Sequence, residues 1–507
     1  MEISFSAADP LLQPLSLLAL VFHQEATADD PTLAAADRAL DGSLRRAILE
    51  ERFRGRAGQT LLVHTQGRLA AERLMLIGLG KRSSSQPADM RPAAGRAARA
   101  AASVGASKGG LVLLPVAADP EDEPSFSDIQ ALAEGALLGA YRFDKYLSGD
   151  NRPPEPLAAL LIFSRTAANN KYCAAAARTL ARAQETARAV AMARDLVNEP
   201  AAVMTPTRMA ETARELAHAA GLEFTVLGPT ECRERGMGLF LAVSQGSDEE
   251  PRFIHLAWKP AAPRKRIVLV GKGVTFDSGG LSLKTNDGML DMKVDMAGAA
   301  AVLSAIGAVA REKLPVEVHA LAACTENMPS GRSYKLGDVL RSMAGKTVEI
   351  NNTDAEGRLT LADALTYGLA LKPDIVIDFA TLTGACVVAL GQHTAGVMSN
   401  NEALSVAWLN AARAAGEEMW PLPLPGRLSE QLKSEIADMK NTGERWGGAL
   451  TAGHFLKEFV GETPWVHVDI AGPASADKEF GHIGKGGTGF AVASILRFIR
   501  DAAGGER

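Results

Sequence analysis

The residues of this chain whose types and spacing point most clearly to chemistry lie at positions 352–359, which read Asn-Thr-Asp-Ala-Glu-Gly-Arg-Leu. Asp354 and Glu356 are two positions apart, so in extended chain their carboxylates point the same way, as two oxygen ligands of one hard cation would. An arginine beside such a cation, here Arg358, can hold a second anion or a developing oxyanion. The run follows an expected strand and precedes an expected helix. The alternative interpretation is therefore that its acidic residues only interact favourably with the dipole at the helix N-terminus.

A second group of ionisable residues lies upstream of this run. Lys272 and Asp277 belong to a glycine-rich segment that follows a strand-like stretch, and Lys284 comes seven residues after Asp277. Asp295 opens an expected helix of small residues, 297–310. Strand ends and helix starts meet at one edge of an open α/β sheet, where such folds place their chemistry. So many ionisable residues at such positions are hard to explain by packing alone.

Six motifs together resemble the leucyl aminopeptidase family, also called cytosol aminopeptidases. In chain order they are 271–280, 292–300, 326–331, 352–359, 381–384 and 469–472. They cover most of residues 190–500, whereas the N-terminal third matches the family only loosely. The resemblance implies a hydrolase, an aminopeptidase that removes N-terminal residues from peptides with two metal ions per subunit.

The resemblance also implies a set of metal ligands. Asp277 and Glu356 would bridge the two ions, and Asp354 would complete one of the two sites. Lys272 and Asp295 would complete the other. A lysine amine coordinates a metal only after it loses its proton, and two adjacent dications would lower its pKa. The alternative for Lys272 is an ion pair with Asp277. Such ligands suit Mn, Zn, Mg or Co and do not choose among them, and we expect Mn or Zn.

Two further roles follow from the same resemblance. Lys284 would polarise the scissile carbonyl and stabilise the tetrahedral oxyanion. Arg358 would hold a bicarbonate that passes a proton from water to the leaving amine. The family positions that bind the substrate fall on four residues of this chain: Met292, Thr381, Leu382 and Gly384. A methionine above a glycine floor suits an apolar first side chain such as Leu.

Composition excludes several other classes of protein. The net charge is -5, so no basic field recruits nucleic acid or an anionic membrane, and we expect no DNA partner. Peptide substrates are what the resemblance implies. Segment 11–22 has no basic residue before it and contains Pro14, so we expect a first strand there and not a signal peptide. No apolar run approaches the roughly 20 residues of a transmembrane helix.

The cysteines and histidines show no metal-ligand spacing. The four cysteines lie far apart, which suits a reducing cytoplasm, and Cys324 and Cys386 sit in apolar, strand-like runs where we expect them to be buried. Six histidines are scattered and are interpreted as structural: His255, His319, His393, His454, His467 and His482.

The length of the chain predicts two α/β domains. We expect an N-terminal domain at 1–165 with a scaffold or assembly role, a linker helix at 166–196 and a catalytic metallopeptidase domain at 197–507. Alternating strands and helices in the last predict a mixed, largely parallel sheet flanked by helices, with the di-metal site at the carboxyl ends of its strands. The resemblance adds a homohexamer.

The individual elements expected from the pattern are as follows. Strands are expected at 17–22, 60–64, 74–77, 111–115, 157–163, 252–257, 267–270, 316–323, 347–351, 374–379 and 466–470. Helices of the second domain are expected at 297–310, 361–371, 450–459 and 489–500.

Three rival interpretations carry less support. A dinucleotide-binding loop at Gly271-Lys272-Gly273 would need a third glycine where Phe276 stands. A DNA-binding regulator conflicts with the acidic balance of the chain. A scaffold that has lost activity conflicts with the presence of all seven positions that the family uses as ligands or catalytic groups.

Overall fold

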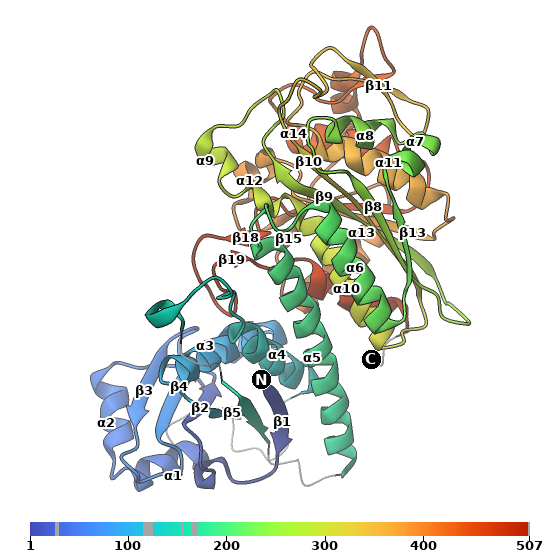
Figure 1. The fold of residues 1–507 in the computed structure, drawn as a ribbon. Helices are drawn as coiled ribbons and strands as arrows, with labels where there is room; N and C mark the ends of the chain where they lie inside the picture. The colour runs from blue at the N-terminus through green and yellow to red at the C-terminus, as the bar shows by residue number, and fades with distance from the viewer. Residues whose placement is uncertain (26–29, 115–124, 154–156, 165–169, 505–507) are drawn as a thin grey trace. The chain divides into compact units, whose positions relative to one another are not determined.

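The computed structural model of the chain describes residues 1–25, 30–114, 125–153, 157–164 and 170–504 (Figure 1). The chain forms two compact units, one made of Met1–Ala187 with Lys478–Gly484 and the other of Arg188–Asp477 with Lys485–Arg507. The division falls within the long helix α5, Asn170–Asn198. The boundary expected near residue 165 lies outside the described residues.

The first unit contains a six-stranded sheet in the order β1-β6-β5-β2-β4-β3. Its strands are β1 Glu2–Ser6, β2 Leu17–Phe22, β3 Thr60–His64, β4 Arg73–Gly78, β5 Lys108–Leu113 and β6 Ala159–Phe163. Its helices, besides α5, are α1 Pro31–Ala39, α2 Ser43–Glu50, α3 Met90–Ser103 and α4 Phe126–Gly139.

The expectation that segment 11–22 holds the first strand is wrong, because β1 precedes it. β1 was not predicted from the sequence, because a strand with one buried side chain, Ile3, shows little hydrophobic pattern. The last residue of the strand expected at 111–115 lies outside the described residues.

The second unit is built on an eight-stranded mixed sheet in the order β15-β14-β17-β13-β9-β10-β8-β7. The four central strands are mutually parallel: β17 Trp465–Asp469, β13 Ile375–Ala380, β9 Arg266–Asp277 and β10 Glu317–Asn327. The outer strands are β7 Glu223–Leu227, β8 Arg252–Trp258, β14 Ala395–Ser399 and β15 Met419–Pro421. The expected mixed, largely parallel α/β sheet is therefore confirmed.

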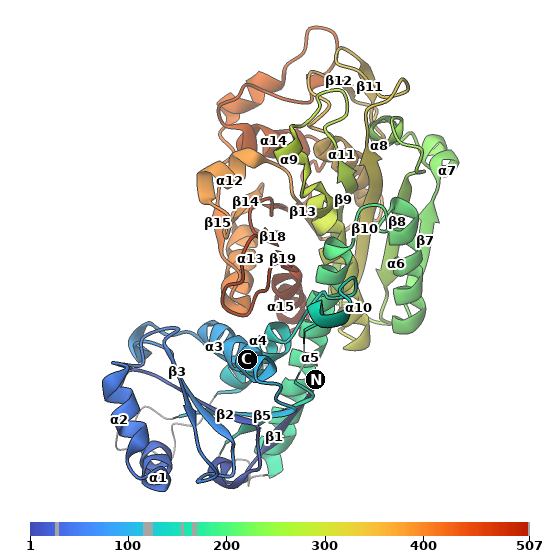
Figure 2. The same ribbon diagram turned by 60° about the vertical axis from the view of Figure 1, so that its left-hand side comes forward.

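Helices cover both faces of this sheet (Figure 2). One face carries α6 Pro206–Ala220, α10 Ala297–Arg311, α13 Glu402–Ala415 and α15 Val492–Ala502. The other carries α8 Gly238–Ser244, α11 Gly357–Leu369 and α14 Gly448–Lys457. The strand period separates the two faces, because Val270 shares a buried core with Leu361 of α11, whereas a Cβ on neighbouring Gly271 would lie 2.5 Å from Ala299 of α10.

Two sequence expectations need correction here. The strand expected at 267–270 continues to Asp277, so the glycine-rich segment is strand and not the loop that follows one. Its glycines hid it from the pattern, since glycine carries no hydrophobic signal and is unfavourable in strands. Cys386 is buried as expected, but it lies in the short helix α12, Gly384–Leu390, and not in a strand.

Among the described residues, one helical stretch has the length and composition to cross a membrane. It is Asn286–Arg311, and 83% of its most apolar window is buried inside the protein, as in a core helix. We expected no run of this length. The stretch reaches it because α9, Asn286–Met289, the short 3-10 helix η6, Met292–Met296, and α10 follow one another along the chain.

Candidate active site

A bulge in β9 brings Lys272 and Asp277 to the same face of the sheet. The two residues are an odd number of positions apart, so on a regular strand their side chains would point to opposite faces. The pairing of β9 with β10 skips Thr275, since Thr325 pairs with Val274 and Glu326 pairs with Phe276. Because the extra residue of a bulge shifts the alternation by one, both charged side chains face the side of α11.

Glycines at the starts of α10 and α11 let these helices pack closely on the sheet, and this brings the other candidate ligands near β9. Glu356 precedes the first turn of α11, where a Cβ on Gly357 would lie 2.5 Å from the Cε of Lys272. Asp295 lies in η6, directly before α10. A Cβ on Gly298 of α10 would lie 2.0 Å from a backbone oxygen of β13, so only glycine allows α10 to sit this deep.

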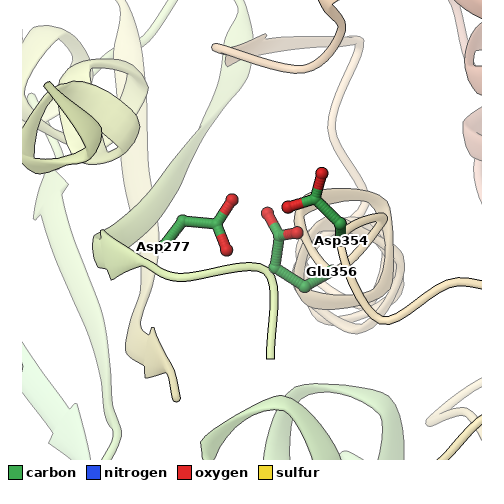
Figure 3. Close-up of side chains that lie close together, drawn as sticks. All are labelled: Asp277, Asp354 and Glu356. Atoms are coloured by element: carbon green, nitrogen blue, oxygen red, sulfur yellow. The ribbon is translucent and has the colours of Figure 1, made fainter. Parts of the chain in front are cut away.

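Three of the candidate carboxylates converge on one point (Figure 3). Ligand oxygens of Asp277, Asp354 and Glu356 all lie within 4.8 Å of one another. Asp277 ends β9, while Asp354 and Glu356 belong to the connection that leads from the short strand β12, Thr347–Glu349, into α11. Asp277 and Glu356 are buried, and Asp354 is half-buried. Such a group of oxygens is one that hard divalent cations favour.

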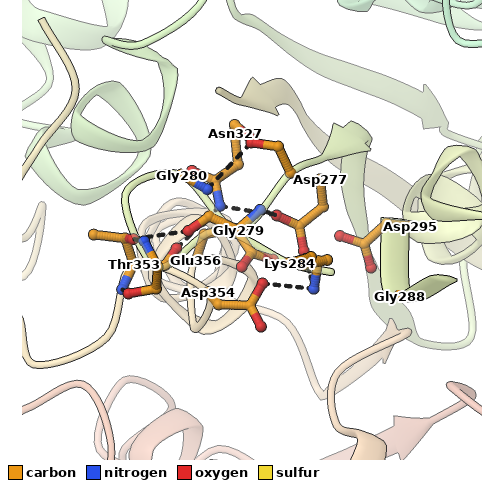
Figure 4. Close-up of polar contacts among 12 residues, drawn as sticks. Asp277, Gly279, Gly280, Lys284, Gly288, Asp295, Asn327, Thr353, Asp354 and Glu356 are labelled. Atoms are coloured by element: carbon orange, nitrogen blue, oxygen red, sulfur yellow. Dashed lines mark hydrogen bonds and ion pairs between the residues drawn. The ribbon is translucent and has the colours of Figure 1, made fainter. Parts of the chain in front are cut away.

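Two lysines lie among these carboxylates, each between two acidic partners. The Nζ of Lys272 is 2.7 Å from Asp295 Oδ1 and 2.8 Å from Glu356 Oε1. The Nζ of Lys284 is 2.9 Å from Asp277 Oδ2 and 2.5 Å from Asp354 Oδ1 (Figure 4). The alternative interpretation of Lys272, an ion pair with Asp277, is therefore wrong, because Lys272 pairs with Asp295 and Glu356.

Burial and mutual repulsion shift the pKa values of the acidic side chains in this cluster. Burial, followed by repulsion from Glu356, raises the pKa of Asp277 to about 6. Burial likewise raises the pKa of Asp295 well above its usual value, although Lys272 opposes the shift. Burial lowers the pKa of Lys272, but the neighbouring carboxylates outweigh it and hold the ammonium charged. Four acidic side chains outnumber the two ammonium groups, and the raised pKa values of two of them mean that further positive charge would favour their ionised forms.

The cluster also contains buried oxygen atoms that no protein donor reaches. Asp295 Oδ2 and Glu356 Oε2 are buried and accept no hydrogen bond in the described part of the chain. A buried acceptor left unpaired costs about 1–3 kcal/mol, and more when it is charged. Divalent cations would satisfy both atoms, so the residues present fit a metal site.

Arg358 lies in the first turn of α11, two residues after Glu356. Its Nη1 donates a hydrogen bond of 2.8 Å to the backbone oxygen of Asn441, while its buried Nε has no hydrogen-bond partner in the described structure. Burial lowers the pKa of Arg358 to about 10, against the opposing charges of Glu356 and Asp469. The side chain is therefore a buried cation with a donor still unused.

The expected substrate positions occupy different settings. Thr381, which follows β13, touches the cluster directly, because its Oγ1 donates to Asp295 Oδ1 at 2.7 Å and its backbone oxygen lies 3.1 Å from Lys272 Nζ. Met292 and Leu382 are half-buried. Gly384 is exposed, and a Cβ placed on it would meet no atom within 4 Å, so the space above it is open.

One residue that sequence analysis missed holds this loop in place. Asp469, at the end of β17, accepts hydrogen bonds from Leu382 N at 3.1 Å, Thr383 N at 3.4 Å and Thr383 Oγ1 at 2.7 Å. It is fully buried. Its place in the 469–472 motif was the available signal, but nothing in the spacing linked it to residues more than eighty positions earlier.

Four of the six histidines lie in hydrogen-bonded settings outside the carboxylate cluster. His255 Nε2 lies 2.9 Å from His319 Nδ1, and His467 Nδ1 lies 2.6 Å from Asp378 Oδ1. His454 Nε2 lies 2.9 Å from the backbone oxygen of Pro425. These contacts suit the structural interpretation of all four.

Comparison with known proteins places this geometry in a family. Residues 191–496 match the model of the catalytic domain of the cytosol aminopeptidase family, and residues 20–150 match the model of its N-terminal domain. A protein of Cyanothece sp. described as "Probable cytosol aminopeptidase" is 44% identical over 490 residues, which cover 95% of this chain and 96% of its own. One of Roseiflexus castenholzii with the same description is 44% identical over 505 residues and 99% of each chain.

Solved structures agree with the sequence relatives. A mutant of tomato leucine aminopeptidase superimposes with a TM-score of 0.89 at 35% identity, covering 98% of this chain and 96% of its own. The bottromycin maturation enzyme BotP in complex with Mn superimposes with a TM-score of 0.83 at 38% identity, covering 96% of this chain and 99% of its own. With both domains matched and the acidic cluster in place, this chain belongs to the cytosol aminopeptidase family and is a metal-dependent exopeptidase.

Proposed function

We propose that the enzyme removes N-terminal amino acids, Leu and other apolar residues by preference, from peptides with the help of two divalent cations, Mn or Zn. The residues that would hold the cations are Lys272, Asp277, Asp295, Asp354 and Glu356. The observation that carries the proposal is the convergence of three carboxylates, together with two buried carboxylate oxygens in the same cluster that have no hydrogen-bond partner among the described residues. A pair of divalent cations at these atoms would supply a water of low pKa and polarise the scissile carbonyl.

The two lysines have different tasks in this proposal. Lys272 is fully enclosed between Asp295 and Glu356, so it joins the ligand set by giving up its proton. Lys284 is the more exposed of the two, with 17% of its side chain accessible against 4% for Lys272. An ammonium group that reaches solvent can turn from Asp354 toward a bound substrate and stabilise the negative charge that develops on the carbonyl oxygen.

Arg358 provides a second positive group at the same edge of the sheet. Its unused Nε donor is suited to a small planar anion, and bicarbonate fits the proposed role of a carrier of protons between water and the leaving amine. Asn441 holds the other end of the guanidinium, so the arginine is oriented before any anion arrives.

Specificity would come from the open space beside Gly384. A peptide whose first residue is apolar could place that side chain against Met292 and the open floor, with the backbone of Thr381 and Leu382 beside its main chain. Asp469 accepts a hydrogen bond from Leu382 of this loop, and Thr381 of the same loop donates one to Asp295. The loop proposed to bind the substrate is therefore connected to a proposed metal ligand.

For the rest of the chain we propose a supporting role. The N-terminal domain would act as a scaffold for assembly of a cytoplasmic homohexamer, joined by α5 to the catalytic domain beyond residue 196. Light scattering coupled to gel filtration would test the assembly, since a hexamer has six times the 53.3 kDa mass of the chain. A monomer of full activity would contradict it.

The activity itself is tested by hydrolysis of leucine-p-nitroanilide. We expect EDTA to abolish hydrolysis and added Mn or Zn to restore it. We expect Glu356→Ala and Lys284→Ala to abolish it while circular dichroism shows an intact fold. Full activity in both variants would refute the assignments.

A further inference from the structure

We infer that Asn327, at the carboxyl end of β10, is a positioning residue that orients Asp277 and joins it to the ligand loop 353–356. The inference deepens the proposed function and rests on it, because it concerns how the proposed ligands are held. None of the five ligand positions includes Asn327, and it lies outside the groups assigned to catalysis.

A single amide group of Asn327 reaches two segments that carry proposed ligands. Its Nδ2 donates to Asp277 Oδ1 at 2.8 Å and to the backbone oxygen of Thr353 at 3.0 Å (Figure 4). Both partners are acceptors, so the amide nitrogen and not the amide oxygen must face them. Asn327 is fully buried and is also the strand partner of Asp277 in the pairing of β10 with β9.

This contact decides which oxygen of Asp277 remains for a cation. Oδ1 accepts two hydrogen bonds, one from Asn327 Nδ2 and one from Gly279 N at 2.9 Å. Among the described residues, Oδ2 has only the ammonium of Lys284 as a partner, at 2.9 Å. Because an oxygen with two donors has little lone-pair density left, Asp277 offers one defined atom, Oδ2, to the cluster.

Glycine at position 280 leaves room for the amide in this orientation. A Cβ there would lie only 2.8 Å from Asn327 Oδ1, and Gly280 has φ +63, a conformation that favours glycine. The buried Oδ1 has no hydrogen-bond partner in the described structure, so the side chain gives up one acceptor interaction to keep both donors on its partners.

The ligand loop has other anchors, so loss of Asn327 should leave the loop folded. Tyr334 Oη donates to the same Thr353 oxygen at 2.7 Å. Thr353 Oγ1 donates to Gly279 O at 2.7 Å and accepts from Ser282 N at 2.8 Å. Apart from the backbone of its own turn, Asp277 Oδ1 has only Asn327 as a donor in the part of the chain that the structure describes. The loop therefore keeps other hydrogen bonds when the Asn327 amide is lost, whereas Asp277 Oδ1 loses its side-chain donor.

The test measures Mn affinity of the full-length, metal-free protein by isothermal titration, with the variants Asn327→Leu and Tyr334→Phe. Leucine has the branched shape of asparagine without its donors. We expect Asn327→Leu to weaken Mn binding by about 10–100-fold, the usual loss for such a supporting hydrogen bond. Tyr334→Phe should bind Mn within about threefold of the unchanged protein, since Asp277 keeps both donors.

A matched control is Asn351→Leu, because Asn351 is an exposed residue just before the same loop. It should leave Mn affinity unchanged. Unchanged affinity in Asn327→Leu would overturn the inference, as would an equal loss in Tyr334→Phe, which would show that only loop anchoring matters. If Asn327→Leu fails to fold, Asn327→Ala carries the same comparison. Failure of the unchanged protein to bind Mn would instead refute the proposed function.

Discussion

The ammonium group of Lys272 lies 2.8 Å from the carboxylate of Glu356, and both residues are buried. Two residues proposed to bind the same pair of metals thus form an ion pair with each other. The ammonium group thus pairs with the carboxylates in the metal-free protein, and the proposed binding of metal to Lys272 would have to displace its proton.

Lys284 offers a way to separate catalysis from metal binding. Substitution Lys284→Met removes an ammonium that neutralises Asp277 and Asp354, so Mn affinity should stay the same or rise. Because Lys284 is proposed to stabilise the oxyanion, its loss should lower kcat by about 10²–10³-fold. Titration calorimetry and steady-state kinetics on one preparation check both. Weaker Mn binding in this variant would mean that Lys284 supports the metals and not the reaction.

Arg358 should make the reaction respond to bicarbonate. In bicarbonate-free buffer we expect a lower kcat that is restored by added bicarbonate, while Arg358→Met should be slow and unresponsive. The physical reason is that the buried Nε of this arginine has no other partner in the described structure. The measurement is kcat against bicarbonate concentration for both proteins. An equal response of Arg358→Met and the unchanged enzyme would remove the arginine from this role.

Gly357→Ala should separate stability from metal binding. The added Cβ would lie 2.5 Å from the Cε of Lys272, which is the far part of a flexible side chain. The fold should survive, because alanine is the better helix residue at the start of α11, but Lys272 must move. We expect Mn affinity to fall about 10-fold or more while circular dichroism shows that the metal-free protein is still folded. Unchanged Mn affinity in a folded variant would show that the position of Lys272 does not matter for metal binding.

His255 should make the catalytic domain sensitive to acid. Burial, then the neighbouring His319, lowers the pKa of His255 from 6.5 to about 4. A histidine with a lowered folded-state pKa stabilises the fold in its neutral form, so its contribution is present above about pH 6.5 and is lost as the pH falls toward 4. The loss amounts to at most about 3 kcal/mol.

The comparison that checks this is urea unfolding at pH 7 and pH 5 for the unchanged protein and for His255→Gln. The variant is expected to lose less free energy of unfolding between the two pH values, even if it is less stable at pH 7. An identical pH dependence of both proteins would contradict the assignment. Metal-free protein should be used, so that metal release does not mask the effect.

The sequence predicts the chemistry of this site better than its geometry. Asp354, Glu356 and Asp277 lie in motifs whose residue types already specify cation binding, and the structure brings all three together. The bulge at Thr275 could not be predicted, because a shift of strand register depends on the pairing with β10 and leaves no trace in residue type.

Residues that support the site were also missed for a physical reason. Asn327 and Asp469 act through hydrogen bonds to residues far away in sequence, and a single buried amide or carboxylate at a strand end has many ordinary uses. The alternative interpretation of Lys272, an ion pair with Asp277, was wrong for the same reason. Lys272 lies closer in sequence to Asp277 than to Asp295 or Glu356, but the fold places it between the latter two.

The central claim is that this carboxylate cluster is a two-cation site, and anomalous diffraction from crystals grown with excess Mn tests it most directly. We predict two anomalous peaks, both within coordinating distance of Asp277 and Glu356, with Lys272 Nζ bound to one of them. A single peak, or none, with Lys272 still paired to Asp295 and Glu356 would contradict the account.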